Sequence, residues 1–154
     1  MKSILSVTLV MLSAPSLLAE TLSQQSFRIE VDDGWVHSIE KGPRSHDGLG
    51  DLISIHHPDG AGVLKIQSYR VPNSVDPQRL REMTNVDGSE QLDWQSWGDF
   101  SGYQHSYSEK GLFHRQWWLT DDKTIVFFVY STGAEPQQAE KNEISKIVHS
   151  ITAN

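Results

Sequence analysis

The sequence predicts an α+β domain in which an antiparallel β-sheet lies between helices, in an α/β/α arrangement. Short apolar or alternating segments recur along the chain, separated by turn residues, whereas only two segments have the apolar spacing of a helix. The run 125–130 (IVFFVY) is apolar at odd and even positions alike. Both faces of that strand are therefore expected to be covered, as in the middle of a sheet with a layer on each side.

Eight strands are expected from these patterns. The first alternates apolar and polar residues up to the turn 32–34 (DDG), and Lys110-Gly111 predicts a hairpin turn between the sixth and seventh. Counting from that turn pairs Tyr107 with His114, His105 with Gln116 and Tyr103 with Trp118. These side chains share one face, either to stabilise the sheet or to line a pocket. The strands are expected at 26–31, 35–41, 52–56, 63–71, 92–97, 100–108, 112–120 and 125–130.

Two helices are expected. A short one follows the fourth strand, because Asp76 can accept hydrogen bonds from the opening turn and Pro77 suits the first helical position. A closing helix is expected over 136–151, with an apolar stripe that can supply one of the layers on the sheet. That stripe consists of Ile144, Ile147, Val148 and Ile151.

The amino terminus has the pattern of a secretory signal. Lys2 precedes an apolar run over 4–12, and small Ala19 suits a cleavage site. A membrane anchor is the alternative, but spanning a bilayer takes about 20 consecutive apolar residues. We therefore expect a signal peptide at 1–19 and one mature domain at 20–154, periplasmic or secreted, with no membrane anchor after cleavage.

Composition limits the kinds of partner. The chain has 20 Asp and Glu against 13 Lys and Arg, a formal net charge of −7, and no Cys. Such a charge disfavours nucleic acid and anionic lipid surfaces, and it favours a basic partner. Without cysteine there is no disulfide, no lipid-anchoring thiol and no thiol nucleophile. The expected partner is another protein, with no nucleic acid.

Several segments together resemble the PsbP-like superfamily. They are an aromatic first hairpin, the helix after the fourth strand, the stretch 102–111 with Trp118, the strand 126–130 and the last helix ending at 147–151 (IVHSI). This superfamily includes an extrinsic photosystem II subunit, a eukaryotic Ran-binding relative and small exported bacterial proteins. The resemblance implies an antiparallel sheet between helices and a binding or assembly role without catalysis. No functional residue is carried over from it.

The densest group of histidines and acids lies in and after a turn-rich loop. Loops on a rigid sheet often bind ligands, so His46, Asp47, Asp51 and His57 are candidate binding residues. Zinc needs three or four converging ligands, and adjacent His56 and His57 point to opposite faces of a strand. We therefore expect neither a metal nor a cofactor here.

Trp94 and Trp97 are two further candidate binding residues. Trp offers a large stacking area with a polar edge, which suits a partner protein or a sugar ring. Spaced by three, the two side chains fall on opposite faces of a strand, so one is expected in the core and the other exposed.

No catalytic residue is predicted. The sequence has neither a Gly-x-Ser-x-Gly nucleophile elbow nor a Gly-rich phosphate loop. The leading hypothesis is a non-catalytic binding or assembly module of the bacterial cell envelope. An immunity-type inhibitor of a secreted toxin or cell-wall hydrolase is the alternative, and a metal-dependent hydrolase using the region 46–57 is the third.

Overall fold

The computed structural model describes residues 19–42 and 48–154. The predicted signal peptide falls outside the described residues apart from Ala19, and so do His46 and Asp47. The strands are β1 (Glu20–Ser23), β2 (Phe27–Val31), β3 (Val36–Glu40), β4 (Leu52–His56), β5 (Gly62–Arg70), β6 (Gln95–Trp97), β7 (Phe100–Glu109), β8 (Leu112–Thr120), β9 (Thr124–Thr132) and β10 (Thr152–Ala153). The helices are α1 (Pro77–Met83) and α2 (Gln138–His149).

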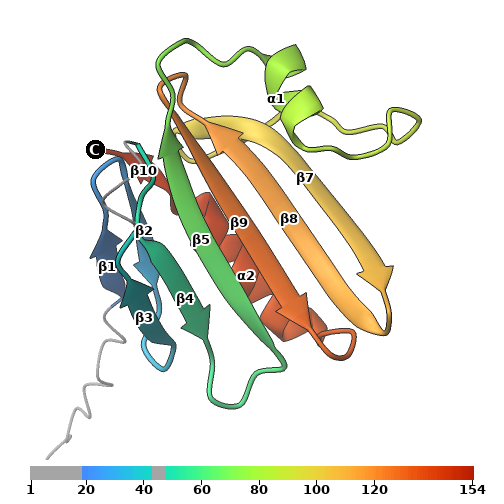
Figure 1. Cartoon of the computed structure of the whole chain (residues 1–154). Coiled ribbons are helices and arrows are strands. Elements are labelled where there is room, and N and C mark those ends of the chain that lie inside the picture. The colour runs from blue at the N-terminus through green and yellow to red at the C-terminus, as the bar shows by residue number, and fades with distance from the viewer. Residues whose placement is uncertain (1–18, 43–47) are drawn as a thin grey trace, which may run out of the picture.

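Seven strands form one antiparallel sheet in the order β3-β4-β5-β9-β8-β7-β6, and β1, β2 and β10 form a second, small sheet (Figure 1). The apolar run 125–130 belongs to β9, the central strand of the large sheet. β10 pairs with β2 through Thr152 opposite Arg28, which joins the two ends of the described chain. The predicted α+β class is confirmed, with strands as the main component.

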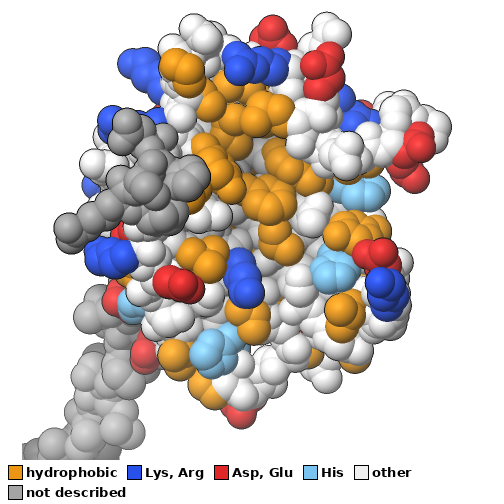
Figure 2. Space-filling view, viewed as in Figure 1, with side chains coloured by type: hydrophobic (Ala, Val, Ile, Leu, Met, Phe, Trp, Pro, Cys, Tyr) orange, Lys and Arg blue, Asp and Glu red, His pale blue; other side chains and the backbone are white. Residues whose placement is uncertain are grey.

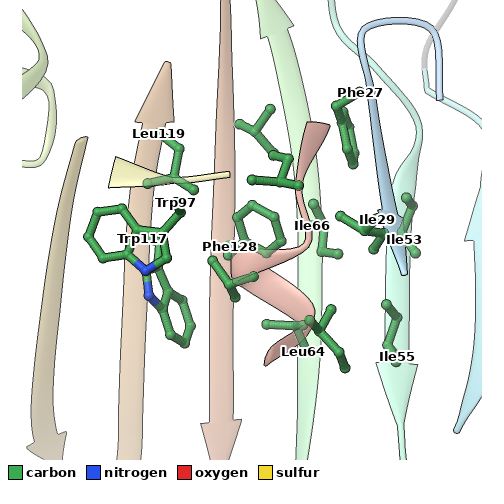
Figure 3. Packing of buried hydrophobic residues seen from close by; sticks show 14 of the residues in the cluster. Phe27, Ile29, Ile53, Ile55, Leu64, Ile66, Trp97, Trp117, Leu119 and Phe128 are labelled. Atoms are coloured by element: carbon green, nitrogen blue, oxygen red, sulfur yellow. The ribbon is translucent and has the colours of Figure 1, made fainter. Parts of the chain in front are cut away.

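The main core lies between one face of the large sheet and a layer made of α2 and the small sheet. Figure 3 shows buried side chains of β4, β5, β8 and β9 on that face, with Phe27 and Ile29 of β2 lying on the side of β4 and β5. The predicted stripe of α2 completes the layer, because Ile144, Ile147 and Val148 are all buried in this core. We call this side of the sheet the covered face.

The opposite side, which we call the open face, is covered only at one end. There α1 buries Leu80 in a second cluster with Val75, Tyr103, Trp118 and Ile125. Phe127 and Val129 of β9 remain half-buried beyond it. The expectation that both faces of 125–130 are covered is therefore wrong, and the sheet is not enclosed between helices.

The sequence predicted the start of the short helix more accurately than the number and length of the strands. Asp76 accepts a hydrogen bond from the Arg79 amide at 2.8 Å, which confirms the start of the short helix. That helix follows the fifth strand and not the fourth, because 20–23 forms a strand of its own. The strand expected at 92–97 is shorter, Gln95–Trp97.

The hairpin register is confirmed in full. Lys110 and Gly111 have φ values of 51° and 77°, as a two-residue turn of this kind requires. The pairs Tyr107 with His114, His105 with Gln116 and Tyr103 with Trp118 stand directly opposite one another. The rings of Tyr107 and His114 are stacked, with centroids 4.9 Å apart.

Gly102 lies where β7 and β8 approach each other too tightly for a side chain to fit. A Cβ at this position would collide with the carbonyl oxygen of Trp118 on the neighbouring strand, which cannot move without breaking the ladder. We expect Gly102→Ala to lower the free energy of unfolding by about 3 kcal/mol, the upper range for overpacking. Gly88→Ala, where nothing lies within 4 Å, should change it by less than about 0.5 kcal/mol in the same denaturant titration. Equal values for the two variants would contradict this interpretation.

Candidate binding cleft

Three segments meet around a cleft at one end of the sheet, the lower end in Figure 1. They are the β2–β3 turn, the β4–β5 loop and the first turns of α2. The cleft has a volume of about 580 Å³, within the range of known ligand sites. Its lining residues are Asp32, Asp33, Trp35, His57, Asp59, Gly60, Ala61, Glu135, Gln137, Ala139, Glu140 and Glu143.

The lining is strongly acidic. Six of these residues are Asp or Glu, and none is Lys or Arg. Lysines of α2 reach two of the acids from outside the lining: Lys146 Nζ lies 2.6 Å from an Asp32 oxygen, and Lys141 Nζ lies 2.9 Å from Glu135. The cleft keeps an excess of negative charge after these pairs are counted.

Glu140 holds the cleft together. Its carboxylate accepts the amide N–H groups of Ala61 at 3.0 Å and Gly62 at 3.1 Å, and the hydroxyl of Tyr130 at 2.7 Å. Burial opposes its ionisation, but these hydrogen bonds and the nearby His57 outweigh that effect, so the pKa of Glu140 is lowered. Burial, and then the bond to Glu140, raise the pKa of Tyr130. The carboxylate therefore fixes the β4–β5 loop against α2.

Trp35 and His57 form the aromatic part of the lining. Their rings meet edge to face with centroids 5.4 Å apart. His57 Nδ1 accepts the amide of Asp59 at 3.1 Å, which holds the imidazole in place. Trp35 also packs on the main core, so this wall is fixed from behind.

The arrangement suits a cationic group. Within the described part of the chain, the Asp59 and Glu143 side chains make no hydrogen bond or ion pair, so both can accept from a ligand. The hydrocarbon stem of a lysine or arginine can lie on an indole while its charged end meets a carboxylate. Among residues 19–42 and 48–154, no three His, Asp or Glu side chains form a group suited to a metal ion.

The residues proposed from the histidine-rich loop do not form one site. His57 lines the cleft, but Asp51 stands at the other end of β4, about 20 Å away for six extended residues. There Asp51 accepts the Gly42 amide at 3.0 Å and pairs with Lys41 at 3.4 Å. The hydrogen bond from the Gly42 amide is the main reason that the pKa of Asp51 is lowered. His46 and Asp47 lie outside the described residues.

The two tryptophans divide as expected. Trp97 is 2% exposed and belongs to the main core, so its side chain offers no binding surface. Trp94 is 41% exposed and meets Tyr103 edge to face, with centroids 5.3 Å apart. It lies beside β6, at the opposite edge of the sheet from β3 and the cleft. A binding role for Trp94 stays a prediction.

Sequence analysis missed most of the cleft. Asp32 and Asp33 indicated only a turn, and the sequence analysis assigned no role to the acids of α2. These residues are brought to the β4–β5 loop by the packing of α2 against β2, which no local pattern indicates. The net charge was the only signal in the sequence for an acidic site.

Neither a family model nor a curated protein matches the chain. Solved structures do. A crystal structure of a protein from Bacteroides thetaiotaomicron VPI-5482 matches with a TM-score of 0.59 at 14% identity, covering 83% of this chain and 45% of that one. This chain therefore spans less than half the length of that protein. The likeness shows a shared fold.

Two further structures cover nearly the whole of both chains. Cyanobacterial PsbP from Synechocystis sp. PCC 6803 has a TM-score of 0.47 at 12% identity and covers 96% of this chain and 98% of that one. LpqN of Mycobacterium tuberculosis, described as involved in cell envelope biogenesis, has a TM-score of 0.42 at 14% identity. It covers 89% of this chain and 91% of that one. One of the two is a PsbP, a member of the superfamily that the sequence resembles. At these scores neither likeness carries an argument about family or function.

No helix in residues 19–42 and 48–154 is long and apolar enough to cross a membrane.

The lowered pKa of Glu140 predicts an acid-sensitive cleft. Because the folded value lies below the ordinary 4.5, the ionised carboxylate stabilises the fold above about pH 4.5, and this contribution is lost as the pH falls through the lowered value. Glu140→Gln should lower the free energy of unfolding by about 1–2 kcal/mol at pH 7, allowing for solvent screening, and by much less near pH 3.

Glu143→Gln is the matched control, because it removes one cleft carboxylate without removing a hydrogen bond of the described structure. Chemical denaturation at both pH values should find this variant close to the unmodified protein. A Glu140→Gln effect that is equal at pH 7 and pH 3 would disprove the role assigned to the ionised carboxylate.

Proposed function

We propose that the protein is an exported, non-catalytic binding module of the cell envelope that holds a basic segment of a partner protein in the acidic cleft. The observation that carries this proposal is the concentration of six carboxylates and an indole in one concave site without a lining Lys or Arg. Export to the periplasm or beyond rests on the signal-like sequence 1–19.

The cleft favours a peptide cation over a bare metal ion. Glu140 is already engaged by two amides and a hydroxyl, and two other acids are paired with lysines. The remaining carboxylates line the same cleft as the Trp35 indole, which suits an organic cation with an apolar stem. The net charge of −7 would in addition speed the approach of a basic partner at low salt.

No reaction is part of the proposal, which gives the carboxylates of the cleft lining the role of binding a cation. An immunity-type inhibitor is a narrower form of the same function, in which the basic segment belongs to a toxin or a cell-wall hydrolase. Inhibition of a basic cell-wall hydrolase by the mature protein, lost on removal of the cleft charges, would favour that form.

A hexa-arginine peptide tests the cleft directly. We expect saturable binding to the mature protein by calorimetry, weakened between 50 and 200 mM salt, and no binding of hexaglutamate. The double variant Asp59→Asn with Glu143→Gln should bind about fivefold more weakly, since two solvent-accessible ion pairs contribute about 1 kcal/mol in total.

A charge-matched control separates the cleft from the overall charge. Asp93→Asn with Glu109→Gln removes the same two charges from residues that do not line the cleft. This control should bind hexa-arginine within about twofold of the unmodified protein. If both double variants lose affinity equally, attraction comes from net charge alone and the cleft is not the binding site.

A further inference from the structure

The open face of the sheet carries an apolar strip of exposed and half-buried side chains, which shares no lining residue with the acidic cleft. β9 is the central strand, yet Phe127 and Val129 are half-buried on this face because α1 covers only one end. Val63 and Tyr69 of the neighbouring β5 are 37% and 39% exposed, and Met83 of α1 is 49% exposed. Figure 2 shows hydrophobic side chains gathered on this face over β5, β9 and α1.

Two hollows lie along this strip and share Phe127. The first, of about 350 Å³, is lined by Leu52, Val63, Lys65, Ile66, Gln67, Phe127, Val129 and Ser131. The second, of about 420 Å³, reaches α1 and is lined by Tyr69, Leu80, Met83, Thr84, Gln116, Trp118, Ile125 and Phe127. Each has the size and apolar character of a small-molecule site.

Among residues 19–42 and 48–154, Lys65 is the only charged residue that lines either hollow. Its neighbours across the sheet are Ser54 on β4 and Val129 on β9, and no ion pair of the described residues includes it. The site therefore presents one cation at the edge of an apolar strip. This is the complement of an apolar chain that ends in an anion.

Charge decides between the possible occupants. A second copy docked face to face would bring two Lys65 side chains onto hollows whose described lining residues include no acid to pair with either. An anionic membrane surface would be repelled by a protein with a net charge of −7. A single carboxylate next to Lys65 is not, because charges farther than about 8 Å are largely screened at physiological salt.

We propose that the open face binds a free long-chain carboxylate, with its carboxylate at Lys65 and its alkyl chain along β9 toward α1. From Val129 to Ile125 the strand advances about 13 Å, which suits an extended chain of roughly this length. The alkyl chain covers Phe127 and Val129, whose apolar side chains are only half-buried in the protein alone.

Dodecanoate below its micelle concentration is the probe, titrated into the mature protein by calorimetry. We expect saturable binding that Lys65→Gln weakens about tenfold, since a charge-assisted contact is lost. Dodecyl maltoside, with the same alkyl chain and no charge, should bind more weakly and show no difference between the protein and Lys65→Gln. Val129→Asp should abolish binding of both.

Matched controls locate the site. Lys110→Gln removes a lysine at the β7–β8 turn, and Glu143→Gln changes the acidic cleft; both should bind dodecanoate as the unmodified protein does. Lys65 is exposed, so its replacement tests the site even if Val129→Asp fails to fold. The proposal is overturned if dodecanoate shows no saturable binding, or if Lys65→Gln and Lys110→Gln behave alike. It is also overturned if an acidic amphipathic peptide binds this face and dodecanoate does not.

Discussion

Burial of one face of the seven-stranded sheet is the interaction on which the rest of the structure depends. Trp117 and Phe128 on β8 and β9 are fully buried there against α2 and the small sheet, and the Trp117 indole donates to Gln104 at 2.9 Å. Because α2 must lie across this face, its first turns come to the β4–β5 loop, where Glu140 binds two amides. The acidic cleft is thus a consequence of how α2 covers this face. The opposite, open face is covered only at one end, by α1.

The sequence predicted what neighbouring residues determine. The start of α1 depends on Asp76 and Pro77, and the pairing of β7 with β8 depends on the Lys110-Gly111 turn, so both could be predicted from a few adjacent positions. β1 and β10 could not, because each is only a few residues long and gains its order from pairing with β2. The cleft was missed for the same reason, since its lining comes from three separate segments and only His57 had been singled out.

The error about β9 has a geometric cause. Apolar residues on both sides of 125–130 correctly predicted a central strand, but the further prediction that both of its faces are covered was wrong. α1 has seven residues and is about 10 Å long, whereas seven strands extend over about 29 Å. One short helix cannot cover such a sheet, so Phe127 and Val129 keep the composition of a core without its environment.

Net charge and local charge lead to different conclusions about ligands. The value of −7 correctly indicated an acidic surface, but composition does not locate it, and the structure gathers six carboxylates at one end. Of the described residues that line the two hollows of the open face, only Lys65 is charged. Since screening limits each charge to its surroundings, a basic peptide at the cleft and a carboxylate at Lys65 are compatible in one small domain. The sign of the whole molecule governs how fast a partner arrives, and the residues within a few ångströms govern what stays bound.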